Sequence, residues 1–422
     1  MRAHNDQNVV LTAGRRGRER TRWRAPDGPS YSLLRVTNQP TSQPAFPELA
    51  AWREFCSVLV EQGERLLDPG FPAGNPDPSE AIRHLSTQAV CWLSHAFARE
   101  RDLGIHRLND LLTPWGGPNA DNVYHYAAID DQSTYRLHGR MGSCEQWLLA
   151  LRVGNLHQKE NGTLGEGSAS DFGIGEGDEV DLILSPSGEG GLKIPPGTKM
   201  MSLREYYYDW RPLEPAMLLL DRLDGPPPTG GVVRALEVAG EQFKSSVEYW
   251  AEYMVNARAR GVDNTFIQPR KEPRGLQTMS YSFCFWDLAP DEALVVTFPK
   301  PSAAYWSTQL YQLGWFEALD MGRQTSLNHK QTKSGPDDVV TVVASAADPG
   351  VANWLDTEGR PEGLLTLRTA WLQSPAPKAE TRVVTLAELD SAVDADVPRV
   401  DATARATTIA ARREHLRWRF RT

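Results

Sequence analysis

Short strand-like runs follow one another through most of this chain, and turn residues separate them. The clearest run, 305–311, alternates its side chains between two faces with the period of two that a β-strand imposes. The sequence lacks the regular alternation of strands and helices that a doubly wound parallel sheet requires. The runs therefore predict a mainly β protein with two antiparallel β-sandwich or jelly-roll-like modules. The predicted strands are 134–139, 147–153, 179–184, 199–207, 216–220, 277–286, 293–298, 304–312, 339–344, 364–372 and 381–384.

Added α-helices are predicted before the first β region and between the two. Apolar residues recur at spacings of three and four after Pro47, which indicates a first helix. A second helix begins at Asp77, which suits the N-cap position and forms a capping box with Glu80. A third, at about 236–259, follows a stretch rich in Gly and Pro, and we interpret it as a connector between the β modules.

These elements divide the chain into consecutive segments. The first segment is polar and rich in Arg, Pro, Ser and Thr, so a disordered basic tail is predicted there. The predicted division is a tail at 1–45, a helical region at 46–114, a first β module at 115–224, a linker and connecting helix at 225–262, a second β module at 263–390 and a C-terminal tail or helix at 391–422.

Charge is distributed unevenly along the chain. The net charge is −9, yet residues 1–25 carry seven arginines against one aspartate and one glutamate, which gives +5 and leaves −14 for the remainder. An acidic body repels phosphates, so no nucleic-acid partner is expected. The basic start is not followed by an apolar stretch, so it does not read as a secretory signal. A solvated helix end is predicted for the C-terminal arginines Arg412, Arg413, Arg417, Arg419 and Arg421.

Missing patterns narrow the class of protein further. No run of about 18 apolar residues occurs, so no membrane span is predicted. The four cysteines show no CxxC spacing, which argues against a zinc site or a disulfide framework and favours a cytoplasmic protein. Signatures of serine hydrolases, zinc proteases and zinc deaminases are missing, and neither a cofactor nor a metal is expected. In one open alternative, His125, His138 and His157 meet across strands and bind a metal.

A first candidate segment is G-G-P-N-A-D-N-V-Y-H-Y at 116–126. Asn119, Asp121 and Asn122 are typical turn and capping residues, which favours a structural role. Tyr124 begins the strand that follows, whose side chains point to both faces of a sheet. Tyr124 is therefore a candidate ligand contact.

A second candidate segment is L-R-E-Y-Y-Y-D-W-R-P-L-E at 203–214. Its acids, arginine and tyrosines either orient a polar ligand or form cross-strand pairs worth a few tenths of a kcal/mol each. Trp210 is one of thirteen tryptophans, which either fill β-sandwich cores or line an aromatic cleft. Strand alternation puts Arg204, Tyr206 and Tyr208 on one face, and Glu205, Tyr207 and Asp209 on the other.

A third candidate segment is D-P-G-V-A-N-W-L-D-T-E-G at 348–359, with Asn328 and His329 before it and Arg368 after it. If Asp348, Asp356 and Arg368 meet, the guanidinium neutralises both carboxylates and fixes the loop. In the structural interpretation, Asp348 begins a turn with Pro349 and Gly350. Asn353 caps this turn, and Trp354 closes the end of the sandwich.

Several of these motifs together resemble the bacterial family called domain of unknown function 1214, which is often paired with its sister family 1254. The resemblance is strongest over 270–385 and extends more weakly over 115–215. It implies two β-sandwich or jelly-roll-like modules with added helices and a tendency to oligomerise, and no settled activity comes with it. The matching motifs are W-G-G-P-N-A-D-N-V-Y, T-Y-R-L-H-G-R-M-G, R-E-Y-Y-Y-D-W, D-E-A-L-V-V-T-F-P, D-P-G-V-A-N-W-L-D-T-E-G and L-L-T-L-R.

The leading functional hypothesis is a cofactor-independent lyase, isomerase or hydrolase that acts on a hydroxylated or hydrophobic small molecule. General acid–base chemistry requires a carboxylate whose pKa is raised by burial, and an aromatic cleft would supply that burial. The alternatives are a non-catalytic glycan- or protein-binding sandwich and a structural homo-oligomer. The predicted catalytic residues are Asp209, Asp348, Asp356 and His329, and the predicted ligand contacts are Tyr124, Arg204, Tyr206, Tyr208, Trp210, Asn328, Asn353, Trp354 and Arg368.

Overall fold

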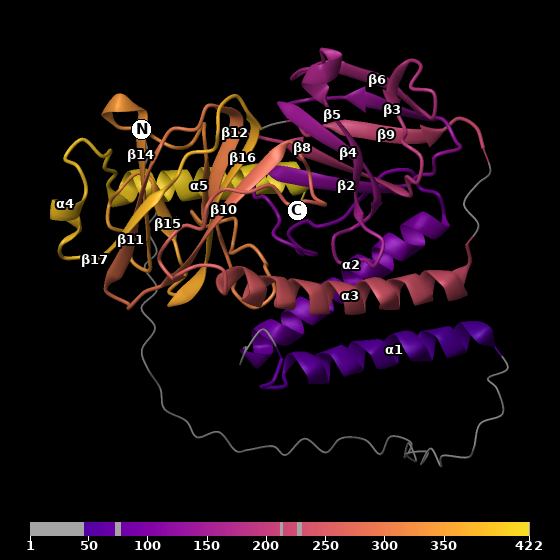
Figure 1. Ribbon diagram of the computed structural model, residues 1–422, viewed down its shortest axis with the longest axis horizontal. Coiled ribbons are helices and arrows are strands. Elements are labelled where there is room, and N and C mark those ends of the chain that lie inside the picture. The colour runs from indigo at the N-terminus through magenta and orange to yellow at the C-terminus, as the bar shows by residue number, and fades with distance from the viewer. Residues whose placement is uncertain (1–45, 72–76, 212–213, 226–229, 422) are drawn as a thin grey trace, which may run out of the picture. The chain divides into compact units, whose positions relative to one another are not determined.

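The computed structural model describes residues 46–71, 77–211, 214–225 and 230–421. The predicted disordered tail at 1–45 lies outside these described residues. Phe46–Thr422 forms one compact unit, in which four sheets are joined by helices (Figure 1). The predicted mainly β fold with added helices is therefore confirmed. Among the described residues, no helix is long and apolar enough to cross a membrane.

The first module consists of two facing sheets. One has the strand order β1-β2-β8-β4-β5 and the other the order β7-β6-β3-β9. Apolar side chains from both sheets, including Leu149 and Leu203 from one and Leu137 and Leu182 from the other, form the core between them. The strands are β1 (His106–Arg107), β2 (Asn122–Ala128), β3 (Tyr135–Arg140), β4 (Gln146–Gly154), β5 (Gly162–Ser168), β6 (Glu179–Ser185), β7 (Gly191–Lys193), β8 (Met200–Tyr206) and β9 (Met217–Arg222).

The second module is built in the same way. Its sheets have the orders β10-β16-β12-β13 and β15-β14-β11-β17. Trp286 and Trp306 pack against Leu294 and Val342 in the core between the two sheets. The strands are β10 (Met279–Asp287), β11 (Glu292–Pro299), β12 (Ala303–Tyr311), β13 (Ser326–Asn328), β14 (Val339–Ser345), β15 (Trp354–Asp356), β16 (Glu362–Leu372) and β17 (Glu380–Thr385).

The two modules repeat one topology. Counted from β2 and from β10, each module places its strands in the orders 1-7-3-4 and 6-5-2-8. In each, the fifth and sixth strands pair in parallel, whereas the pairs between the other neighbours in these two orders are antiparallel. The chain from 122 to 385 is therefore a structural duplication.

The inner sheets of the two modules pack against each other. Leu148 and Tyr206 of the first module share an apolar cluster with Met279, Tyr305 and Ala370 of the second. Both faces of strand β12 are consequently covered, because its even residues point into the core of the second module and its odd residues point toward the first. The two modules thus contribute four sheets in all. One apolar layer lies within each module, and a third lies between the two inner sheets.

Three long helices lie side by side along these modules (Figure 1). Asp77 caps the second one as predicted, since its carboxylate accepts hydrogen bonds from the amides of Ser79 and Glu80. The predicted capping box is wrong, because the Glu80 carboxylate pairs with Arg360 instead. The helices are α1 (Pro47–Leu66), α2 (Pro78–Glu100), α3 (Val232–Arg258), α4 (Leu389–Ala392) and α5 (Ala402–Phe420), with short 3-10 turns at Ala169–Phe172 and Pro336–Asp338.

The C-terminal helix α5 contacts both modules. Arg405 bonds to Asp348 and to the Val351 carbonyl in the second module, and Arg419 donates to the Ala120 carbonyl in the first. Arg412 is 3% exposed and donates to the carbonyls of Arg323, Ser326 and Met321. The prediction of a solvated helix end is therefore wrong for Arg412 and Arg419, although Arg413, Arg417 and Arg421 are exposed.

Candidate functional site

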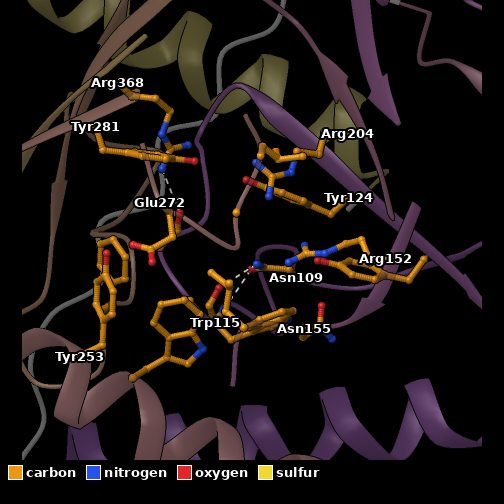
Figure 2. Close-up of a pocket in the computed structure, with 18 of the residues that line it drawn as sticks. Asn109, Trp115, Tyr124, Arg152, Asn155, Arg204, Tyr253, Glu272, Tyr281 and Arg368 are labelled. Atoms are coloured by element: carbon orange, nitrogen blue, oxygen red, sulfur yellow. Dashed lines mark hydrogen bonds between the residues drawn. The ribbon is translucent and has the colours of Figure 1, made fainter. Parts of the chain in front are cut away.

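A cavity lies between the two inner sheets and helix α3 (Figure 2). Strands β2, β4 and β8 of the first module contribute to its lining, as do β10 and β16 of the second. Its volume is about 90 Å³, where one water requires ~15 Å³ on the same measure. A small organic molecule therefore fits in it.

Each module contributes one tyrosine–arginine pair to this cavity. Tyr124 on β2 is the direct cross-strand partner of Arg204 on β8, and Tyr281 on β10 is the partner of Arg368 on β16. Each guanidinium lies over its tyrosine ring, at 5.4 Å from the centroid for Arg204 and 5.3 Å for Arg368. Figure 2 shows the two pairs on opposite sides of the cavity. Because β2 corresponds to β10 and β8 to β16, the pairs are equivalent in the duplication.

A third guanidinium, that of Arg152 on β4, also faces the cavity. Arg152 is 4% exposed and Arg368 is 3% exposed, whereas Arg204 is half-buried. Within the described residues, neither these two arginines nor Arg204 has a carboxylate within salt-bridge distance, and the Nε–H group of each lacks a hydrogen-bond acceptor. Burial lowers the pKa of Arg152, whereas for Arg204 and Arg368 the neighbouring tyrosines outweigh burial and raise the pKa. Buried cations without a counter-charge are costly, so these groups are candidates for anion recognition.

The hydrogen bonds that the guanidiniums do make position them. Arg368 donates to the Gly117 carbonyl at 3.0 Å and to the Tyr311 hydroxyl at 2.9 Å. Among the described residues, the guanidinium of Arg204 donates only to the sulfur of Met279, at 3.4 Å. The guanidiniums of the first module, those of Arg152 and Arg204, therefore make fewer hydrogen bonds to oxygen acceptors than that of Arg368 does.

The W-G-G-P motif forms part of the cavity wall. Asn109 holds Trp115 through two hydrogen bonds to the tryptophan backbone, at 2.7 and 3.0 Å. Gly116 and Gly117 have φ values of +61° and +67°, in the left-handed region that favours glycine. A Cβ atom at Gly117 would lie 2.4 Å from the Phe316 ring, so the motif needs glycine for space as well.

The remaining wall is aromatic and contains one acid. Trp115, Trp250, Tyr253 and Phe316 form the apolar surface, and Trp250 and Tyr253 come from α3. Glu272 is the one carboxylate among the described residues that line the cavity, and it lies 3.6 Å from the guanidinium of Arg270. Burial raises the pKa of Tyr253, and the charge of Glu272 adds to this shift. The predicted connecting helix thus forms part of the site.

Three histidines lie near this wall, of which His95 and His157 are buried and His106 is half-buried. His95 and His106 share a hydrogen bond of 2.9 Å between their rings, and the ring of His157 lies 5.4 Å from that of Trp115. Burial lowers the pKa of His106 and of His157 to about 4 and that of His95 well below its usual value.

Stability is expected to fall as the pH drops from 6.5 to 4.5. Unfolded imidazoles bind a proton near pH 6.5, whereas the folded His106 and His157 do so only near 4, so the unfolded state binds more protons in this window. The loss is about 2.5 kcal/mol per histidine by pH 4.5. Urea unfolding at intervals from pH 8 to 4.5 measures it. A flat profile would contradict neutral burial, and His157→Gln is expected to reduce the slope.

The structure brings three of the predicted ligand contacts into the cavity, namely Tyr124, Arg204 and Arg368. Tyr206 and Tyr208 lie in the adjacent apolar cluster, on the predicted face. Trp210 and Asn328 lie elsewhere, where both donate hydrogen bonds to Asp121, at 2.8 and 2.7 Å.

The predicted catalytic residues are not brought together. Asp348 is paired with Arg405 and Asp356 with Arg323, so the proposed meeting of both with Arg368 is wrong. Asp209 is exposed and paired with Arg211. His329 packs its ring 4.8 Å from that of Tyr208. None of these four lines the cavity, so this structure does not support a shared acid–base site for them.

The segment at 348–359 is a structural element. Asp348 does begin a turn, because its carboxylate accepts the Gly350 amide at 2.9 Å. Asn353 does not cap this turn, since its side chain binds the backbone of Lys333 and Thr341. Trp354 is buried and donates to Ser345. The open alternative of a metal site is also wrong, because the three histidines bond separately: His125 to Glu205, His138 to Asp221 and His157 to Gln242.

Sequence reasoning missed Arg152, Tyr281 and Glu272. Arg152 and Tyr281 lie within runs that read as ordinary strands, and Glu272 lies in a segment without a recognisable motif. Leu-Arg occurs at 203–204 and at 367–368, but it also occurs at 34–35, 151–152 and 416–417, so this dipeptide does not single out the two pairs.

Searches among known protein families and among curated proteins found no match, so the resemblance to family 1214 stays a prediction. Among solved structures, an uncharacterised protein from Burkholderia cenocepacia is similar, with a TM-score of 0.72 and 26% identity over 81% of this chain and 98% of that chain. The VPA0106 protein from Vibrio parahaemolyticus aligns with a TM-score of 0.42 and 14% identity, over 77% of this chain and 100% of that one. The first of these structures shares the fold described here.

Proposed function

We propose that this protein binds a small organic anion in the cavity between its two β modules. One observation carries the proposal: Arg152, Arg204 and Arg368 face one cavity without a carboxylate partner among the described residues. Removing a charge from water costs several kcal/mol unless an opposite charge compensates for it. A bound carboxylate would supply that charge and would accept hydrogen bonds from the guanidinium edges.

The rest of the wall favours an apolar or aromatic body on this anion. Trp115, Trp250, Tyr253 and Phe316 give the cavity broad apolar faces, and such walls with a few converging polar groups are typical of small-molecule sites. A highly hydroxylated ligand would leave its hydroxyl groups without enough partners on this aromatic side.

Calorimetric titration with benzoate and with neutral benzyl alcohol tests the proposal. We expect benzoate to bind with a Kd at least tenfold below that of the alcohol. Arg152→Gln should reduce this preference, whereas Arg136→Gln, at an exposed arginine paired with Asp181, should leave it unchanged. Equal binding of acid and alcohol, or no binding of any aromatic or aliphatic acid, would overturn the proposal.

A second candidate function is acid–base catalysis on the bound anion, within the enzyme class expected from the sequence. The observation that favours it is the position of Glu272, the one carboxylate among the lining residues, beside Tyr253. A carboxylate and a tyrosine within reach of a bound ligand are suitable as general base and general acid. Turnover would then be lost in Glu272→Gln while binding remained.

Glu272→Gln is expected to tighten the binding of benzoate roughly three- to tenfold, because it removes about 1 kcal/mol of like-charge repulsion in a partly screened site. Calorimetry measures the change. The control is Glu160→Gln, at an exposed acid paired with Lys199, which should have no effect. A weaker affinity of Glu272→Gln would mean that this carboxylate accepts a hydrogen bond from the ligand, contrary to the expectation.

We also propose a cytoplasmic location and a homo-oligomeric state. All four cysteines are free thiols, which fits a reducing compartment. Helix α1 exposes Trp52 and Val60, at 49% and 61%, and its neighbour Phe46 at 65%, which supports association through this helix. Light scattering on the protein, with Trp52→Glu and Val60→Glu combined, tests the second point, and a monomeric wild-type protein would contradict it.

A further inference from the structure

The duplication gives the cavity two half-sites of the same composition. In each inner sheet the third residue of the first strand is a tyrosine, and its partner on the seventh strand is an arginine: Tyr124 with Arg204, and Tyr281 with Arg368. Each pair combines an aromatic face with a planar, fixed donor group. That combination suits a ligand in which a carboxylate is attached to an apolar group, because the guanidinium binds the carboxylate and the ring contacts the apolar group.

The charge of the lining favours a ligand that carries two negative charges. Three arginines line the cavity, and its glutamate, Glu272, already lies 3.6 Å from the guanidinium of Arg270, so three positive charges remain uncompensated among the described residues. A monoanion would leave two of these charges without a partner, whereas a dianion leaves one.

The half-sites differ in one respect. The residue opposite Met200 on β4 is Arg152, and the equivalent residue, opposite Leu364 on β12, is Tyr311. The first module therefore offers two guanidiniums, while the second offers Arg368, whose Nη2 is bonded to Tyr311 and Gly117. The ligand consequently meets a stronger and a weaker end, which fixes its orientation.

We propose that the ligand is a dicarboxylate with a short, rigid apolar spacer, held with one carboxylate on the Tyr124–Arg204 pair and the other on the Tyr281–Arg368 pair. The proposal rests on the proposed function, and it names the ligand class for that site. A compact phosphate has the same charge, but its oxygens cluster at one point. The guanidiniums here come from two modules and lie on opposite sides of the cavity (Figure 2).

A matched ligand series tests this inference on the full chain by calorimetry. The probes are benzoate, the three benzenedicarboxylate isomers, phenyl phosphate and inorganic phosphate. We expect at least one dicarboxylate isomer to bind at least tenfold more tightly than benzoate and than either phosphate compound. If benzoate binds as tightly as every isomer, or a phosphate compound binds tightest, the dicarboxylate inference fails while anion binding stands. If none of these anions binds, the proposed function fails.

Two variants test whether each half-site holds a carboxylate. Arg204→Gln and Arg368→Gln should each reduce the affinity for the best dicarboxylate to within threefold of that for benzoate, and Arg136→Gln should not. A large loss in only one of the two variants would overturn the two-ended arrangement. If both variants fail to fold, the wild-type ligand series still decides the inference.

Discussion

Replacing Asp121 by alanine is expected to lower the free energy of unfolding by about 3–5 kcal/mol, because breaking a buried charge network by removing one partner leaves the others uncompensated. Asp121 is 1% exposed. Its carboxylate accepts hydrogen bonds from Trp210 at 2.8 Å, Asn328 at 2.7 Å and the Tyr305 hydroxyl at 2.6 Å. Those donors come from both modules, so the substitution weakens the contact between them.

The buried arginines of α5 add to this effect. Burial lowers the pKa of Arg412 to about 9 and that of Arg419 to about 10, and the charge of Asp121 acts against both shifts. Their guanidiniums lie 4.1 and 4.8 Å from the centroid of the Trp210 ring, which Asp121 also binds. Without Asp121, two buried cations lose their nearby counter-charge.

Urea denaturation of the two alanine variants Asp121→Ala and Asp209→Ala measures this difference. Asp209 belongs to an exposed ion pair with Arg211, and such pairs contribute roughly 0–1 kcal/mol. If the two variants lose similar amounts of stability, the buried network contributes no more than a surface pair, and the expectation is wrong.

Replacing Gly117 by alanine is expected to cost about 2–5 kcal/mol and to weaken anion binding. The left-handed φ of +67° costs a non-glycine residue ~1–2 kcal/mol, and overpacking against a neighbouring side chain costs ~1–3 kcal/mol more. The added methyl group would lie 2.4 Å from the Phe316 ring, and both residues belong to the cavity wall. Denaturation and benzoate titration measure the two effects.

Gly173→Ala separates backbone strain from crowding. Gly173 has a φ of +69°, almost that of Gly117, and a Cβ atom there would meet nothing within 4 Å. It should lose only the ~1–2 kcal/mol of strain and should bind benzoate normally. Equal losses of unfolding free energy at both positions would show that the Phe316 ring moves aside without reducing stability.

Local patterns made the β modules predictable, and long-range pairing made the site hard to find. Every predicted run forms a strand, because alternation and turn residues are encoded within each run. Apart from β2, which was indicated only through Tyr124, the strands that were not predicted, such as Gly162–Ser168, are rich in glycine or only two to three residues long. Their presence depends on neighbouring strands and not on their own composition.

At the candidate site, too, local patterns were readable in the sequence and long-range contacts were not. Tyr124, Arg204 and Arg368 were found because polar and aromatic residues are dense in their segments. Asp348 was misread because its partner, Arg405, lies 57 residues further along the chain. Nothing near either residue indicates that pairing. The acids and the tryptophan of the motif at 348–359 therefore have a structural role.

The span of helix α5 has a consequence for biosynthesis. Arg419 donates to the carbonyl of Ala120, 299 residues earlier in the chain. Contacts between such distant residues slow folding, because the intervening loop must close before they form. During translation, helix α5 is synthesised after both modules. Both β-sandwiches are therefore expected to form before α5 can bind the first module and fix the cavity between them.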